Sequence, residues 1–257
     1  MKLSIIICTK NRFNSLKALL EYIFKNKFFK DFEVIVIDGN SSDQTKVFCQ
    51  ELYLNKAIKY ANNDGNHVDA RNKGLNIATG EYVCFIDDDD SFSENKFIEQ
   101  VTFLDNNPKI DVVSCTTLFR KDTGLIGSFK ELNHKEIKES LKTMTIEEVC
   151  NFHSCMFRKS TLDKLFKSNA KPVYFYEEFK DGFEGSGLLY TLWFSGCQFA
   201  NLNNCCTIYS LGLHPTSLSN TITPQYYLDN LTGVSNLKKK KFIINLYNSY
   251  KYENGVE

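Results

Sequence analysis

The sequence feature best suited to chemistry is a run of four consecutive aspartates, Asp87 to Asp90. The run follows the apolar segment Tyr82 to Ile86, which has the pattern of a buried strand. Carboxylates crowded together repel one another unless a cation neutralises them, and oxygen ligands suit Mg²⁺ or Mn²⁺. A solvated acidic turn that caps the next helix is the alternative. Because the run follows an apolar strand, we favour a site for a metal ion and a diphosphate.

The first hundred residues must form the elements that position this run. Short β-branched segments alternate with helical patterns, which predicts βαβ units and a parallel sheet whose ligands bind at the carboxyl ends of the strands. The predicted strands are Leu3 to Cys8, Glu33 to Asp38, Ala57 to Tyr60, Tyr82 to Asp87 and Ile110 to Thr116. The predicted helices contain Leu16 to Ile23, Ser42 to Leu54, His67 to Thr79 and Glu94 to Asn106.

The second half of the chain has a less regular pattern. Helical stretches are predicted at His134 to Leu141, Thr145 to Cys150 and Leu188 to Phe194, and a helical tail follows at 221–257. No internal repeat or low-complexity linker divides the chain, so we expect one domain over residues 1–220.

The composition excludes several classes of protein. Lys plus Arg and Asp plus Glu number 31 each, so the net charge is zero and no broad field favours nucleic acid. The nine cysteines include no C-x-x-C pair, and we expect reduced thiols in a cytoplasmic protein. No apolar run is long enough for a signal peptide or a membrane span, so the protein is expected to be soluble or at most peripheral.

Four ordered segments together resemble a known family. They are Ser4 to Arg12, Val34 to Thr45, Ala70 to Gly74 and Gly80 to Asp90. In this order and spacing they resemble the nucleotide-binding half of family 2 glycosyltransferases with the GT-A fold. The resemblance implies an α/β fold with a mostly parallel sheet flanked by helices, in which residues 1–115 bind the nucleotide-sugar and residues 116–220 bind the acceptor.

The resemblance also implies roles for four residues of the donor site. Thr9 and Arg12 would line the base and phosphate region, where a guanidinium offers a charge-assisted fork to a phosphate. Asp38 would accept hydrogen bonds from uracil or ribose, or else cap the helix start after Ser41. Arg71 would contact the nucleotide. For both arginines, an ordinary solvated side chain is the alternative.

The acidic run contains the D-x-D motif of the family. In the favoured register Asp87 meets the ribose and Asp89 ligates the metal ion that bridges the diphosphate. Because all four positions are aspartate, a shift by one residue stays open. Asp88 is then the alternative donor contact and Asp90 the alternative metal ligand.

An inverting transferase needs a general base near the acceptor hydroxyl. Many family members carry a Glu-Asp pair whose aspartate is the base, but here Glu184 is followed by Gly185. Glu184 itself, with its longer side chain, is therefore a predicted catalytic residue, and Asp181 is a second. Glu178 and Glu177 are further candidates, and an orienting role for Glu184 stays open.

His214 lies in a segment that resembles the His-x-x-Ser-x-Ser loop of the family. Its imidazole would complete the metal shell or contact the diphosphate. The other three histidines, His67, His134 and His153, have no such context and are expected to be structural.

The run Lys238 to Lys241 lies beside apolar residues of the tail. An amphipathic helix there would suit peripheral contact with the inner face of the plasma membrane, where polyprenyl-linked acceptors reside. A solvated helix face or an oligomer contact is the alternative.

The predicted function is therefore metal-assisted, inverting transfer of a sugar from a UDP-sugar to a saccharide or polyprenyl-linked acceptor, with Mn²⁺ or Mg²⁺ as the cofactor. By resemblance, the setting is surface polysaccharide or lipopolysaccharide assembly. A sugar nucleotidyltransferase would need a glycine-rich loop after the first strand, where Thr9 to Arg12 contains no glycine. A non-catalytic relative that binds nucleotide-sugar without a competent base is the stronger alternative, because of Gly185.

Overall fold

The computed structural model describes residues 1–27, 29–121, 124–126, 132–140, 150–166, 174–175 and 184–210. The elements in chain order are β1 (Leu3–Thr9), α1 (Phe13–Lys25), β2 (Phe32–Asp38), α2 (Thr45–Leu54), β3 (Lys59–Asn62), α3 (His67–Ile77), β4 (Tyr82–Phe85), β5 (Ser91–Phe92), α4 (Lys96–Asn106), β6 (Val112–Lys121), β7 (Gly124–Ile126), α5 (His134–Ser140), the 3₁₀ turn η1 (Phe152–Ser154), β8 (Met156–Arg158), α7 (Lys159–Phe166), α8 (Glu184–Phe194) and β9 (Phe199–Ser210).

The strands among these residues form one nine-stranded sheet in the order β3-β2-β1-β4-β8-β6-β9-β5, with β7 paired to β6. The first four strands are parallel, as predicted from the βαβ pattern. The rest is mixed, because β8 is antiparallel to both β4 and β6, whereas β9 is parallel to β6 and antiparallel to β5. The α/β sheet is confirmed, and the expectation of a mostly parallel sheet is corrected to one parallel half and one mixed half.

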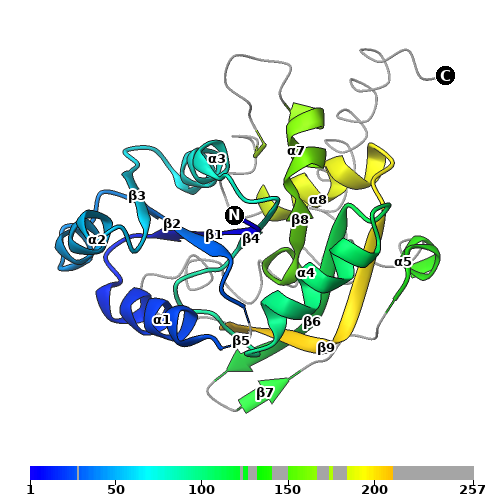
Figure 1. Cartoon of the computed structure of the whole chain (residues 1–257), viewed down its shortest axis with the longest axis horizontal. Coiled ribbons are helices and arrows are strands. Elements are labelled where there is room, and N and C mark those ends of the chain that lie inside the picture. The colour runs from blue at the N-terminus through cyan, green and yellow to red at the C-terminus, as the bar shows by residue number, and fades with distance from the viewer. Residues whose placement is uncertain are drawn as a thin grey trace, which may run out of the picture.

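Helices cover both faces of the sheet (Figure 1). The side chains of the strands alternate between two cores, one on each face. Ile5 and Ile7 of β1 pack in the core shared with α1, α2 and α4. Ile6, between them, packs in the core shared with α3, α7 and α8. Because these strands are buried on both faces, their sequences are continuous apolar runs.

Helix α3 lies unusually close to β1. A Cβ built on Gly74 would lie 2.5 Å from Cγ2 of Ile6, so only glycine allows this approach. Asn66 caps the helix by accepting from the backbone of Asp69, whose side chain accepts in return. The helix therefore begins at a fixed point near the carboxyl ends of the parallel strands, and it carries Arg71 there.

Some predicted bounds differ from the structure. Strand β3 is Lys59–Asn62 rather than Ala57 to Tyr60, and β4 ends at Phe85 because the backbone turns, with the amide of Asp90 donating to the carbonyl of Asp87. Helix α8 begins at Glu184, four residues before the predicted start. The tail 221–257, and with it the predicted domain boundary at residue 220, lies outside the described residues.

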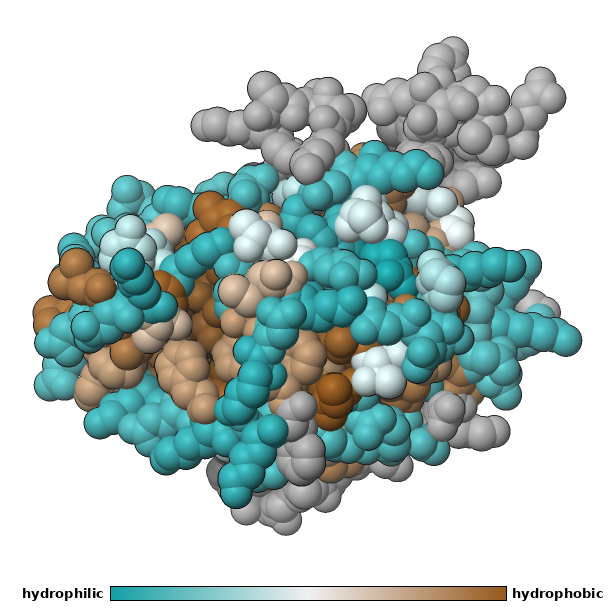
Figure 2. All heavy atoms as spheres, in the orientation of Figure 1, coloured by the Kyte–Doolittle hydropathy of each residue, from teal (hydrophilic) through white to brown (hydrophobic). Residues whose placement is uncertain are grey.

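In the face drawn in Figure 2, hydrophilic side chains predominate around the edges, and apolar side chains show at the left, over α2, and towards the centre. The exposed large apolar residues of that helix are Val47, Tyr53 and Leu54. No helix in the part of the chain that the structure describes combines the length and apolar character needed to cross a bilayer.

Candidate active site

The carboxyl ends of the parallel strands bring the predicted donor residues to one edge of the sheet. Thr9 ends β1 opposite Asp38 at the end of β2, and the aspartate run follows β4 on the other side of β1. The loops after β1 and β2 are tied together, since the amide of Asn11 donates to Oγ of Ser41 at 2.8 Å. This is the edge at which open α/β sheets bind ligands.

The four aspartates divide into two pairs that face different partners. Asp88 is only 2% exposed, and its carboxylate accepts from Oγ1 of Thr9 at 2.6 Å and from Nη1 of Arg12 at 2.7 Å. The same Arg12 nitrogen lies 3.1 Å from Oδ2 of Asp89. Burial raises the pKa of Asp88 to about 6, although Arg12 and Thr9 act against the rise. Asp88 thus links the loop after β1 to the loop of aspartates 87–90, the acidic loop, by hydrogen bonds.

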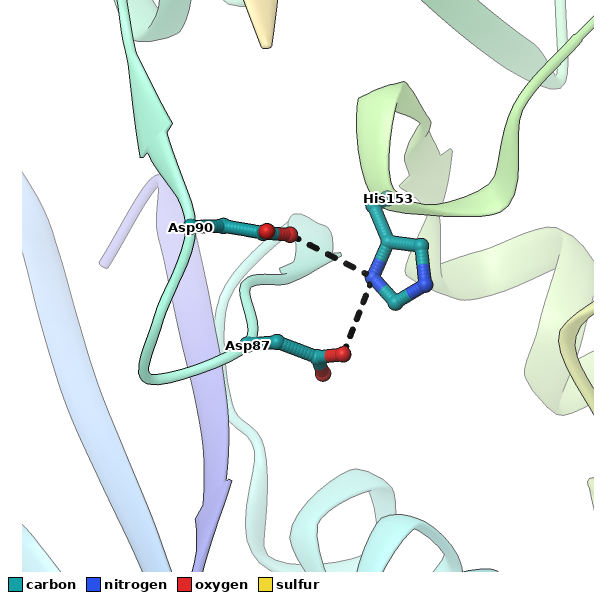
Figure 3. A group of neighbouring side chains, drawn as sticks. All are labelled: Asp87, Asp90 and His153. Carbon is teal, nitrogen blue, oxygen red and sulfur yellow. Dashed lines mark ion pairs between the residues drawn. The ribbon is translucent and has the colours of Figure 1, made fainter. Parts of the chain in front are cut away.

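Asp87 and Asp90 instead face a histidine from a distant part of the chain. Both point at Nδ1 of His153 on η1, with oxygens at 3.6 Å and 3.8 Å from it (Figure 3). One ligand atom from each of the three residues lies within 4.8 Å of the others. Burial lowers the pKa of His153, so its imidazole is neutral at pH 7 and can ligate a metal through nitrogen.

Hydrogen bonds from several elements fix the position of His153. Its amide donates to Oδ1 of Asn151 at 3.0 Å, and its carbonyl accepts from Oγ1 of Thr207 at 3.4 Å. Nε2 of Gln100 on α4 donates to the carbonyl of Ser154 at 2.8 Å. The η1 turn that carries His153 is thus held in place by hydrogen bonds to α4, β9 and the residue before the turn.

Sequence reasoning missed His153, which was expected to be structural. The signal that could have found it is β8. This strand runs antiparallel to β4, so the residues before β8 lie at the same edge as the residues after β4. Recognising the three-residue segment Met156 to Arg158 as such a strand would have placed His153 beside the aspartates.

The donor set fits a divalent cation. Two carboxylates and one neutral imidazole suit Mn²⁺, while carboxylates alone would equally suit Mg²⁺. Of the predicted metal ligands, Asp90 belongs to this group, Asp89 is paired with Arg12, and His214 lies outside the described residues. The roles of Asp89 and His214 as metal ligands stay predictions.

Arg71 joins the acidic loop to the start of α8. Its Nη1 is hydrogen-bonded to Oε1 of Glu184, and its Nη2 lies 3.3 Å from Oδ1 of Asp87. The guanidinium carbon is 5.7 Å from the ring centre of Phe152, close enough for a cation–π contact. Arg71 is therefore a buried cation at the site, rather than a solvated helix arginine.

Glu184 lies at the same site between two basic side chains. Its Oε1 pairs with Arg71, and its Oε2 is 3.3 Å from Nε2 of His67, another histidine that was expected to be structural. Burial by itself would raise the pKa of Glu184, but the charge of Arg71 and the contact with His67 outweigh it and hold the pKa at about 2. So acidic a carboxylate is poorly matched to general-base catalysis near neutral pH.

Asp38 is fully buried and well provided with donors. Its Oδ1 accepts from the amide of Ser41 at 2.9 Å and from its hydroxyl at 2.5 Å, while Oδ2 accepts from the hydroxyl of Tyr60 at 2.9 Å. The alternative role predicted for Asp38 is to cap a helix that starts after Ser41. Helix α2, however, begins only at Thr45 and its N-cap residue is Gln44, so the contact with Ser41 holds the turn after β2 instead. Asp181, Glu177 and Glu178 lie outside the described residues.

Comparison with known proteins adds to this geometry. The model of a protein family described as glycosyl transferase family 2 matches residues 4–166, more than half of the chain. The chain belongs to glycosyl transferase family 2. The resemblance predicted from the four sequence segments is confirmed, and the match extends through Asp87, Asp90 and His153.

Two curated relatives of this family 2 chain are bacterial. A GalNAc(5)-diNAcBac-PP-undecaprenol beta-1,3-glucosyltransferase of Campylobacter jejuni is 45% identical over 101 residues, which cover 35% of this chain and 30% of the relative. The poly(ribitol-phosphate) beta-N-acetylglucosaminyltransferase TarS of Staphylococcus aureus is 29% identical over 188 residues, covering 70% of this chain and 30% of the relative. The matched part thus spans under a third of either relative.

Solved structures confirm the GT-A fold of the family 2 chain. S. aureus TarS in complex with UDP-GlcNAc superposes with a TM-score of 0.66 at 21% identity, covering 89% of this chain and 64% of that one. The mannosyltransferase PcManGT of Pyrobaculum calidifontis, in complex with GDP-Man and Mn²⁺, gives 0.59 at 17% identity, covering 83% and 58%.

Proposed function

We propose that this chain is a metal-assisted, inverting glycosyltransferase that moves a sugar from a UDP-sugar to a saccharide or lipid-linked saccharide acceptor. The observation that carries the proposal is the meeting of Asp87, Asp90 and His153 at the edge of the sheet where β1, β2 and β4 end. In a chain of family 2, a divalent-ion site at this edge is where a nucleoside diphosphate would bind.

The relatives support the donor and acceptor classes. The TarS complex names UDP-GlcNAc as a bound ligand, and the Campylobacter relative is named for an undecaprenol-linked saccharide. Asp38, an acceptor of hydrogen bonds at the carboxyl end of β2, suits the N–H group of uracil. We therefore propose UDP-GlcNAc as the first donor to test.

The chain's own residues would hold the donor from two sides. Asp87, Asp90 and His153 would ligate the metal ion, and Arg12 and Arg71 place two guanidinium groups beside the acidic loop. A guanidinium carries five N–H donors, so it can bind a carboxylate and a phosphate oxygen together. When bound, Mn²⁺ or Mg²⁺ would neutralise charge on the departing diphosphate.

We assign the acceptor proton to Asp181 rather than to Glu184. Both are predicted catalytic carboxylates, but Arg71 lowers the pKa of Glu184 so far that its carboxylate is a weak proton acceptor. If Asp181 is the base, Asp181→Asn should lower transfer at least about 100-fold while UDP binding is kept. Equal transfer by the variant and the unmodified chain would exclude this role.

A second candidate is a protein that binds nucleotide-sugar without transferring it. The observation in its favour is that Gly185 leaves no carboxylate at that position and Phe152 fills the space beside it. The two candidates share donor binding and differ only in turnover.

One experiment separates them. The purified chain is titrated with UDP and UDP-GlcNAc in Mn²⁺ by calorimetry. Release of the nucleoside diphosphate is then followed, as UDP from UDP-GlcNAc and other UDP-hexoses and as GDP from GDP-mannose. Binding with release of UDP or GDP supports the transferase, whereas binding without release from any donor supports the second candidate. Absence of binding to every nucleotide and donor would overturn both.

Matched variants tie the result to the site. Asp90→Asn and His153→Ala should each weaken Mn²⁺ binding and lower UDP release, because each removes one ligand of the proposed metal. Asp31→Asn is the control, since Asp31 precedes β2 at the opposite edge of the sheet and its side chain is 65% exposed. An equal loss in the control variant would place the metal elsewhere.

A further inference from the structure

A chain of contacts between polar and charged side chains crosses the site from α3 to η1. It runs from His67 to Glu184 at 3.3 Å, from Glu184 to Arg71 through their hydrogen bond, from Arg71 to Asp87 at 3.3 Å, and from Asp87 to His153 at 3.6 Å. Glu184 is the one member of this chain that joins α8 to the others. The contacts connect the start of α8 to the proposed metal ligands.

Arg71 is paired with two carboxylates, Glu184 and Asp87, at different distances. Arg71 and Glu184 are each 7% exposed, and in such surroundings a guanidinium is drawn strongly to the nearest carboxylate. Glu184 has the closer contact, and Asp87 the longer one, at the limit of a hydrogen bond. The other oxygen of Asp87, Oδ2, points at Nδ1 of His153 and lies in the group with Asp90 (Figure 3).

Without the charge of Glu184, Arg71 would interact more strongly with Asp87. Asp87 would then be the nearest carboxylate to Arg71 among the described residues. A buried cation that has lost one anion gains more from the next one, because little solvent screens the pair. Asp87 would be drawn to Arg71 and away from the group that faces His153.

We propose that Glu184 is a positioning residue that balances the charge of Arg71 and so keeps the Asp87 carboxylate directed toward Asp90 and His153. The inference rests on the proposed function, because it takes these three residues to be ligands of a divalent cation. Glu184 then contributes to metal and donor binding through Arg71, without touching the transferred sugar or the acceptor proton.

The test measures Mn²⁺ affinity of the full chain with Mn²⁺ as the only ligand, by electron paramagnetic resonance. Glu184→Gln keeps the reach of the side chain and removes its charge. We expect Mn²⁺ binding to weaken about 10-fold or more, the usual effect of removing an outer partner of a metal ligand. Glu184→Asp keeps the charge and should weaken binding less. Glu21→Gln, on an exposed side chain of α1, is the control and should bind like the unmodified chain.

A double variant gives the decisive comparison. Removing the charges of Arg71 and Glu184 together takes away the cation that contacts Asp87, so Arg71→Gln with Glu184→Gln should recover Mn²⁺ affinity to within about threefold of the unmodified chain. A merely structural role predicts no recovery. This variant also keeps the proposal testable if Glu184→Gln alone fails to fold, because failure of the double variant to bind Mn²⁺ would then overturn it.

The outcomes separate this inference from the proposed function. If the unmodified chain binds no Mn²⁺, the metal-assisted function fails. If it binds Mn²⁺ and Glu184→Gln binds equally well but loses only turnover, Glu184 is the proton acceptor and the positioning role is refuted.

Discussion

The aromatic ring of Phe152 occupies the space that any side chain at position 185 would need. A Cβ built on Gly185 would lie 2.5 Å from Cγ of Phe152, far inside van der Waals contact. The ring cannot easily move, because it packs 5.2 Å from the ring of Phe85 and 5.7 Å from that of Phe175. An aromatic contact has thus taken the position at which the family resemblance predicted a carboxylate.

This contact predicts that position 185 tolerates no side chain. Gly185→Ala should lower the free energy of unfolding by about 1–3 kcal/mol, the usual cost of overpacking a buried site. Urea denaturation would measure it. Phe152→Leu should reduce the penalty of the alanine when the two changes are combined, whereas additive losses would show that the Phe152 ring is not the obstacle.

Glu184 predicts a particular dependence of stability on pH. Its pKa in the folded chain, about 2, lies below the ordinary value of 4.5. The ionised carboxylate therefore contributes stability above pH 4.5, and this contribution is lost as the pH falls through about 2. The shift corresponds to about 3 kcal/mol.

The pH effect is measured as the difference in unfolding free energy between the unmodified chain and Glu184→Gln, from pH 7 down to pH 3. The difference should be largest above pH 4.5 and should shrink below it. A difference that stays constant across this range would mean that the Glu184 carboxylate is not held in its ionised form by Arg71.

The division of the aspartate run predicts that two neighbouring aspartates act differently. Asp88→Asn should lower the free energy of unfolding by about 1–3 kcal/mol, because it disturbs buried bonds to Arg12 and Thr9. It should leave Mn²⁺ affinity nearly unchanged. Asp90→Asn should weaken Mn²⁺ binding, since Asp90 belongs to the group with His153. Calorimetry and urea denaturation on both variants check this. If Asp88→Asn weakens Mn²⁺ binding and Asp90→Asn does not, Asp88 rather than Asp90 is the metal ligand.

Tyr60 is predicted to support Asp38 in the donor site. Tyr60→Phe removes a hydroxyl that lies 2.9 Å from Oδ2 of the fully buried Asp38 and 2.6 Å from Oδ1 of Asn62, and it should cost about 1–3 kcal/mol of stability. UDP affinity should also fall, because the Asp38 carboxylate is then less firmly placed. Tyr53→Phe is the control, as Tyr53 is 53% exposed on α2. Unchanged UDP affinity in Tyr60→Phe would separate Tyr60 from donor binding.

The parallel half of the sheet was predictable because its signals are local. Strands β1, β2 and β4 are short apolar runs, so Thr9, Asp38 and Asp87 could be placed at one edge of the sheet from the sequence. Strand β3, Lys59–Asn62, is more polar, and its predicted bounds differ from the structure by two residues. The mixed half carries weaker signals. Strand β8 has three residues, and its antiparallel pairing with β4 depends on contacts between residues more than seventy positions apart.

The sequence by itself determined the family, the parallel sheet and the presence of a run of four carboxylates where a strand emerges, since motif order and hydrophobic periodicity are written along the chain. Only the tertiary structure decided which carboxylates lie together. Asp88 and Asp89 turn to Arg12, whereas Asp87 and Asp90 turn to His153, because each pair of carboxylates finds its partner on an element that the fold brings beside it. Likewise, Glu184 looks like a base in the sequence, and its burial between Arg71 and His67 gives it a different electrostatic role.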